Sequence, residues 1–188
     1  MTCVKCFIPS ITDYIGFYED IIPDFVCDKI MAHDWGMGKS TYSNNDGKSK
    51  TSDDRVEMDE VWVFKDMTYY DDIKKGVLKA TKKYSKYHKN FYCHHHTDFR
   101  INRYSEGGFM SEHVDNIHHS HGQQYGYPVV SVLLYLNDNY EGGEFFVAEK
   151  EFKPKKGSAI VFPSNFMYPH EAKTVIKGIR WSIISWLM

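Results

Sequence analysis

The strongest constraint on the fold is a change in sequence texture at about residue 91. From there to the C-terminus, short apolar and β-branched runs alternate with Gly, Asn, Asp or Pro, a pattern typical of short strands joined by turns. The runs cover residues 91–104, 129–136, 143–147, 159–162, 174–176 and 179–187. Strands that follow one another without intervening helices predict antiparallel β-structure and argue against a βαβ fold.

The first half of the chain predicts helices. Apolar residues at helical spacing follow Ile22-Pro-Asp, which indicates a helix ending near Gly36, and residues 69–88 repeat the pattern with a Lys-rich outer face. A strand is expected within 57–64, whereas the polar segment 37–54 favours a mobile loop. We therefore predict an α+β, mainly β, class: a double-stranded β-helix (jelly-roll, cupin-like) core with N-terminal helices packed on one sheet.

Length and charge narrow the class further. The 188 residues suit one domain, with a helical part at about 20–90 and a jelly-roll core at about 91–188. A net charge of −2 provides no global basic field for nucleic acid or anionic lipid, and no apolar run approaches the roughly 18 residues of a membrane span. Without a secretory N-terminal pattern, we expect a cytoplasmic protein whose four cysteines are free thiols. Cys3-x-x-Cys6 is an unpaired motif, and a zinc site there is the minor alternative.

Two histidine clusters carry no ligand assignment. His94-His95-His96 is expected on a strand, where neighbouring side chains point to opposite faces and cannot converge on one ion. His118-His119-Ser120-His121 lies in a Gly- and Gln-rich loop, 116–127, which suits a solvated loop or a lid.

His113-Val114-Asp115 is different, because an i, i+2 pair on a strand places an imidazole and a carboxylate on the same face. A mononuclear non-haem Fe(II) site needs two His and one carboxylate, so a third ligand must come from elsewhere, and His170 is the candidate. His96-Thr97-Asp98 has the same spacing and remains a competing pair. The context of the later pair, between a Gly-rich turn and a polar loop, favours His113 and Asp115.

Arg180 is the candidate anion-binding residue. It stands in the apolar run Gly178-Ile-Arg-Trp-Ser-Ile-Ile-Ser-Trp186, where strand alternation puts Arg180 and Trp186 on one face. A buried guanidinium is costly unless it meets an anion, and its planar shape matches a carboxylate. An edge position in a structural salt bridge is the alternative. Tyr135 and Tyr104 offer hydroxyl groups from neighbouring runs.

Together, these motifs resemble the iron(II)- and 2-oxoglutarate-dependent dioxygenases, most closely the prolyl 4-hydroxylase-like branch. The similarity extends over residues 22–188. It is carried by Arg103-Tyr-Ser-Glu-Gly-Gly-Phe-Met-Ser-Glu-His-Val-Asp115, Leu134-Tyr-Leu-Asn137, Tyr140-Glu-Gly-Gly-Glu-Phe145, Lys156-Gly-Ser-Ala-Ile-Val-Phe-Pro163, Pro169-His-Glu171 and Arg180-Trp-Ser-Ile-Ile-Ser-Trp186.

The resemblance implies an enzyme that uses Fe(II), 2-oxoglutarate and O2, with ascorbate as an accessory reductant. The implied Fe(II) ligands are His113, Asp115 and His170, and the implied catalytic residues are these three together with Arg180. The implied reaction decarboxylates 2-oxoglutarate oxidatively to succinate and CO2 and hydroxylates a proline-containing peptide or protein.

The co-substrate residues are likewise implied by the resemblance. Arg180 would pair with the distal carboxylate of 2-oxoglutarate, and Tyr135 would hydrogen-bond the same group. Tyr104 matches the tyrosine near the other end of the co-substrate, and Trp186 matches the aromatic wall of the pocket. The family carries Lys or Arg at the position of Arg180, so this residue leaves the sub-branch open.

Substrate identity stays open at the level of sequence. The same chemistry on a free amino acid, another small molecule or a nucleic acid is one alternative, although the net charge of −2 disfavours nucleic acid. A jelly-roll binding protein without catalysis is the other. The loops at 37–54 and 116–127 are the segments expected to close over a substrate.

Overall fold

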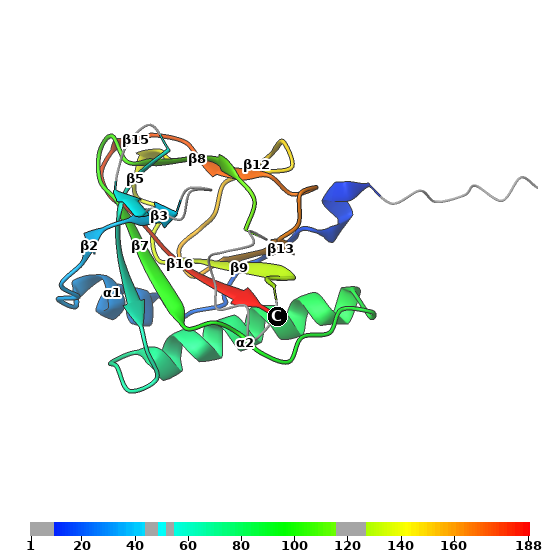
Figure 1. Ribbon diagram of the computed structural model, residues 1–188. Coiled ribbons are helices and arrows are strands. Elements are labelled where there is room, and N and C mark those ends of the chain that lie inside the picture. Colours follow the sequence, from blue (N-terminus) through cyan, green and yellow to red (C-terminus); the bar gives the residue numbers. More distant parts are fainter. Residues whose placement is uncertain (1–9, 44–48, 52–54, 116–126) are drawn as a thin grey trace, which may run out of the picture.

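The computed structural model describes residues 10–43, 49–51, 55–115 and 127–188, which form two large antiparallel sheets with helices against one of them (Figure 1). This arrangement confirms the predicted mainly β class with helices on one sheet. The Cys3-x-x-Cys6 motif and the cluster from His118 to His121 lie outside the described residues, as does most of the 116–127 loop.

The helices match the predicted positions with one shortened end. A short 3-10 helix, η1, spans Ile11–Tyr14, α1 spans Asp24–Ala32 and α2 spans Tyr70–Tyr87. The first α-helix ends before the expected Gly36, because the backbone of His33 is already extended. In the described part of the chain, no helix combines the length and the apolar character that crossing a membrane requires.

The larger sheet has seven strands in the order β1-β13-β9-β16-β7-β6-β2, and the smaller has five in the order β12-β11-β14-β8-β5. The larger sheet comprises β1 Gly16–Tyr18, β13 Ala159–Pro163, β9 Val130–Tyr135, β16 Arg180–Leu187, β7 Phe99–Tyr104, β6 Asp59–Val63 and β2 Gly38–Lys39. The smaller comprises β12 Lys150–Phe152, β11 Phe145–Val147, β14 His170–Ala172, β8 Phe109–His113 and β5 Val56–Glu57. Two ribbons pair β10 Glu141–Gly142 with β15 Val175–Lys177, and β3 Thr41–Ser43 with β4 Ser49–Thr51.

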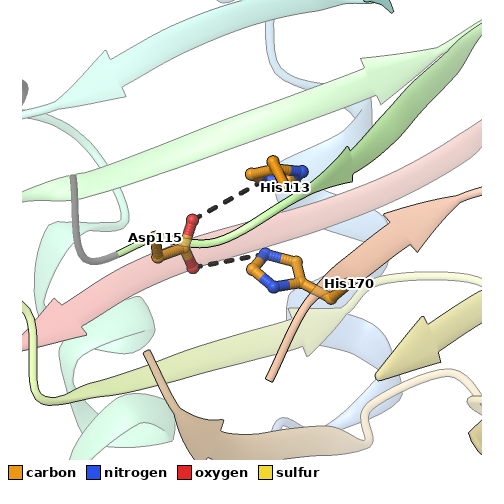
Figure 2. A group of neighbouring side chains, drawn as sticks. All are labelled: His113, Asp115 and His170. Carbon is orange, nitrogen blue, oxygen red and sulfur yellow. Dashed lines mark ion pairs between the residues drawn. The ribbon is translucent and has the colours of Figure 1, made fainter. Parts of the chain in front are cut away.

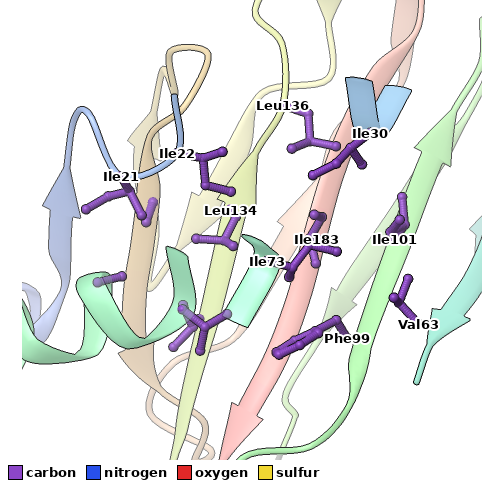
Figure 3. Packing of buried hydrophobic residues seen from close by; sticks show 14 of the residues in the cluster. Ile21, Ile22, Ile30, Val63, Ile73, Phe99, Ile101, Leu134, Leu136 and Ile183 are labelled. Carbon is purple, nitrogen blue, oxygen red and sulfur yellow. The ribbon is translucent and has the colours of Figure 1, made fainter. Parts of the chain in front are cut away.

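The central strand β9 is buried on both faces, which explains why its sequence is a continuous apolar run rather than an alternating one. Leu134 faces the helices, where it packs in a cluster with Ile73 of α2 and Ile30 of α1 (Figure 3). Leu133 and Tyr135 face the smaller sheet and belong to a second cluster between the sheets. The candidate site lies within this second layer.

Several expected segments differ from the structure. The run at 91–104 becomes a strand only from Phe99, because the backbone before it turns away to pair with the C-terminal residue: His94 and His95 donate to the carbonyl of Met188. The 37–54 segment is not simply a loop, since it contains β2, β3 and β4. The expected 57–64 strand is divided between two sheets, with β5 in the smaller and β6 in the larger.

Candidate functional site

Three potential metal ligands meet between the sheets. His113 ends β8, Asp115 follows two residues later and His170 begins β14, whose register places His170 directly opposite His113. One ligand atom from each residue lies within 4.8 Å of the others. His113 Nε2 is 3.6 Å from Asp115 Oδ1, and His170 Nε2 is 3.4 Å from Asp115 Oδ2 (Figure 2). Among the described residues this is the one cluster of three or more His, Cys, Asp or Glu side chains with metal-binding geometry.

Both imidazoles are oriented by nearby backbone. His113 Nδ1 lies 2.8 Å from the carbonyl oxygen of Ser111, and His170 Nδ1 lies 3.1 Å from that of Tyr168. A carbonyl oxygen only accepts hydrogen bonds, so Nδ1 is the protonated nitrogen in each ring. The unprotonated Nε2 atoms, which face Asp115, are therefore the atoms available to a metal.

Asp115 is held by a chain of buried hydroxyl groups. Ser131 Oγ of β9 donates to Asp115 Oδ2 at 2.6 Å, and the Ser131 and Ser164 hydroxyls are 2.8 Å apart. Because the single hydroxyl hydrogen of Ser131 is used in the hydrogen bond to the carboxylate, Ser164 is the donor in the second hydrogen bond. Both serines are fully buried, so this chain fixes the carboxylate in one orientation.

The charges of the three residues are strongly coupled. Burial opposes the charge of Asp115, but His170, His113 and the Ser131 hydroxyl outweigh it and hold its pKa below the ordinary value. Burial and the neighbouring His170 lower the pKa of His113 to about 4. Burial also disfavours the His170 cation, yet attraction to Asp115 raises the pKa of His170.

Arg180 occupies the far end of the same pocket. It is 1% exposed, its Nη2 donates to the Tyr135 hydroxyl at 3.4 Å, and its guanidinium lies over the rings of Tyr104 at 4.8 Å and Tyr135 at 5.2 Å. Its Nε and Nη1 have no hydrogen-bond partner among the described residues. A buried cation with two unsatisfied donors is arranged for an anion rather than for an edge salt bridge, the alternative weighed from sequence.

One pocket joins these groups, with about 380 Å³ of space between the protein atoms, part of it open to solvent. Trp186 lines it, as predicted. Ser182 and Asn102 also line it, and the Ser182 hydroxyl and the Asn102 side-chain oxygen have no partner in the described structure. Its other walls are Arg100, Met110, Leu133, Phe145, Phe162, Ala172 and Ile184.

All the site residues expected from the sequence thus lie in or next to one pocket. Tyr135 does not line the pocket and contacts it through Arg180. It does not bring in the competing pair: Nδ1 of His96 contacts the Thr97 carbonyl, and Asp98 lies beside Tyr70 of α2. The sequence reasoning missed several further residues of the site and of the contacts that hold it, namely Arg100, Asn102, Ser131, Phe145, Phe162 and Ser164. Strand alternation from Tyr104 would have indicated Arg100 and Asn102.

Comparison with known proteins agrees with this geometry. Residues 99–188 match the 2OG-Fe(II) oxygenase superfamily. A PKHD-type hydroxylase of Rippkaea orientalis is 36% identical over 93 residues, which are 46% of this chain and 40% of that protein. Human prolyl 3-hydroxylase 2 is 43% identical over 63 residues, 30% of this chain and 9% of that protein. The match thus spans less than half of each relative.

Solved structures share the fold over nearly the whole chain. A viral collagen prolyl hydroxylase from Paramecium bursaria Chlorella virus-1 has a TM-score of 0.66 at 18% identity and covers 93% of this chain and 95% of its own. A prolyl hydroxylase from Trichoplax adhaerens, solved with a hypoxia inducible factor peptide fragment, has a TM-score of 0.70 at 17% identity and covers 94% and 84%. Residues 99–188 thus match the 2OG-Fe(II) oxygenase superfamily, and the chain has a fold shared with prolyl hydroxylases.

Proposed function

We propose that this protein is an Fe(II)- and 2-oxoglutarate-dependent dioxygenase that hydroxylates a prolyl residue in a peptide or protein. One observation carries the proposal: a cluster of two imidazoles and one carboxylate shares a pocket with a buried arginine that has two unsatisfied donor nitrogens. The first group suits a metal and the second suits an acid.

The donor set fits Fe(II). Two imidazole nitrogens and one carboxylate oxygen are the ligands of non-haem Fe(II) oxygenases, in which the remaining positions stay open. His113, Asp115 and His170 would hold the metal. When bound, iron and 2-oxoglutarate supply the oxidising chemistry, in which 2-oxoglutarate and O2 yield succinate, CO2 and a hydroxylated substrate.

The side chains of the pocket would bind and orient the co-substrate and shield it from water. Arg180 would provide its unsatisfied donors to the distal carboxylate of 2-oxoglutarate. The Tyr135 hydroxyl, 3.4 Å from Nη2, orients the guanidinium and would donate a hydrogen bond to the same carboxylate. Tyr104 covers one face of the guanidinium. Phe145 and Phe162 line the pocket beside His170 and exclude water, which strengthens these charged contacts.

The prolyl substrate is supported by the relatives. The names of the matched hydroxylases include prolyl 3-hydroxylase, and one structural neighbour was solved with a peptide. Ascorbate belongs to the proposal as an accessory reductant. The match to the 2OG-Fe(II) oxygenase superfamily, residues 99–188, includes all three metal-binding candidates and Arg180.

An anaerobic titration tests the proposal. Adding Fe(II) and then 2-oxoglutarate to metal-free protein should produce the visible charge-transfer band of chelated co-substrate. The band should disappear in His170→Ala and require more 2-oxoglutarate in Arg180→Ala. A folded wild type that binds iron but gives no band would refute it. Succinate formation in the presence of proline-containing peptides then tests the substrate class.

A further inference from the structure

Two arginines of β7 are each paired with an acid of the neighbouring strand β6, but on opposite faces of the sheet. Arg103 points away from the pocket and is hydrogen-bonded to its acid through two nitrogens. Its Nη2 and Nε donate to Asp59 Oδ2 at 2.8 and 3.2 Å, and its guanidinium lies over the ring of Trp181 at 5.7 Å. Arg103 therefore serves as the example of a structural arginine, whose hydrogen-bond donors are paired with an acid of the neighbouring strand.

Arg100 points into the pocket and is only partly engaged. Its Nη1 lies 3.5 Å from Glu60 Oε2 without forming a hydrogen bond, although both side chains are only 14% exposed. Glu60 Oε2 instead accepts a hydrogen bond from the Ser40 hydroxyl at 2.7 Å. Arg100 Nε is buried and has no partner in the described structure. Compared with Arg103, this side chain is therefore missing an acceptor.

The two pocket arginines lie at opposite ends of the strand pair β7–β16. Arg180 is opposite Tyr104 in register, whereas Arg100 is opposite Ile184, four residues away or roughly 13 Å along an extended strand. At its own end, Arg100 stacks on Trp186, with 5.3 Å between the guanidinium carbon and the ring. The carboxylate carbons of 2-oxoglutarate are about 5 Å apart, as four C–C bonds of ~1.5 Å allow. The two arginines start from backbone positions that are farther apart than this, so Arg100 can serve an acceptor other than the one held by Arg180.

The position of Glu60 leaves the pocket side of Arg100 unpaired. Arg100 lines the pocket, whereas Glu60 does not belong to the lining residues and contacts Arg100 from outside it. An anion inside the pocket would therefore satisfy the free Nε donor of Arg100.

We propose that Arg100 is a second carboxylate anchor in this pocket, separate from Arg180, and that it binds a carboxylate of the organic substrate next to the reacting ring. This inference rests on the proposed function and specifies its substrate class: a prolyl compound that carries a carboxylate beside the ring. Arg100 is a specificity-determining residue in this scheme, and Glu60 holds it in place until the substrate arrives.

The test compares an acid with its neutral amide. N-acetyl-L-proline and N-acetyl-L-prolinamide are titrated by calorimetry into anaerobic protein loaded with Fe(II) and 2-oxoglutarate. The acid should bind the wild type at least about tenfold more tightly than the amide, as expected for a hydrogen-bonded charge pair. Arg100→Gln should remove that preference for the acid. Arg103→Gln is the matched control, because it makes the same substitution on the opposite face of the same strand, and it should keep the preference.

A second variant guards against misfolding. Glu60→Gln removes the competing charge but keeps an acceptor for Ser40, so the acid should bind more tightly than in the wild type, an effect that damage to the fold would not produce. In Arg100→Gln, 2-oxoglutarate affinity should stay within about twofold of the wild type, a difference of under 0.5 kcal/mol.

The outcomes separate the two proposals. A wild type that fails to bind 2-oxoglutarate at all refutes the proposed function. A wild type that binds 2-oxoglutarate but treats acid and amide alike, including binding neither, overturns the role of Arg100. Retention of the acid preference in Arg100→Gln overturns it as well, and so does a loss of 2-oxoglutarate affinity in that variant, because Arg100 would then serve the co-substrate.

Discussion

Replacing Ser131 with alanine should weaken metal binding without unfolding the protein. The variant removes the 2.6 Å hydrogen bond to Asp115 Oδ2 at a position that is 0% exposed, so water does not readily replace the hydroxyl. A hydrogen bond to a charged group contributes about 1.5–3 kcal/mol, equivalent to roughly a tenfold to hundredfold change in affinity. Loss of outer contacts to metal ligands typically costs a similar ~10- to 100-fold.

The assay is competition for Co(II) between the protein and a chromophoric chelator. Ser131→Ala should lose about 10- to 100-fold in affinity. Ser164→Ala, which removes a neutral hydrogen bond one step further out, should lose only about fivefold. Ser131→Thr keeps the hydroxyl and should retain most of the affinity.

Ser185→Ala is the matched control, because Ser185 is also fully buried but contacts Thr97 on the other face of β16. Its Co(II) affinity should equal that of the wild type. If Ser131→Ala binds Co(II) as tightly as this control, the hydroxyl chain does not position Asp115 and the reasoning fails.

Three further predictions address the co-substrate end, the helix packing and a buried thiol. Arg180→Gln should lower 2-oxoglutarate affinity more than about tenfold, as loss of a charged pair implies, with unchanged Co(II) affinity; a parallel loss of Co(II) binding would contradict separate sites. Gly76→Ala should lower the melting temperature although alanine favours helices by about 1 kcal/mol, because the added Cβ would lie 2.8 Å from Cγ1 of Ile22; a higher melting temperature would show that Ile22 moves aside. Cys27 is 0% exposed and burial raises its pKa to about 11, so iodoacetamide at pH 8 should leave it unlabelled in native protein by mass spectrometry; rapid labelling would contradict its burial.

The fold was predictable where side-chain pattern decides the structure. The apolar run that became β9 and the helical period of α2 are consequences of burial, which sequence records directly. The short strands β2 and β12 were missed because backbone pairing with a neighbour defines them, and their side chains are largely exposed. The absence of a strand before Phe99 was missed for a related reason. The backbone of residues 94 and 95 pairs with Met188, and the local sequence does not indicate a contact with a residue so far along the chain.

The site shows the same division. His113, Asp115, His170 and Arg180 belong to motifs whose residue types imply their chemistry, so the sequence was sufficient to single them out. Arg100 has no such motif, and its importance depends on a comparison with Arg103 that only the positions of the β6 acids allow.

The contacts that orient the three metal-binding side chains differ in range along the chain. Each imidazole is fixed by a carbonyl two residues earlier, so its orientation is set within its own segment. Asp115 instead depends on Ser131 and, through it, on Ser164, which lie 16 and 49 positions away and at or just beyond the ends of β9 and β13. The orientation of each histidine is therefore set locally, whereas that of the carboxylate depends on the packing of the two central strands. A substitution that shifts β9 or β13 should thus disturb the carboxylate of the proposed metal site before it disturbs either imidazole.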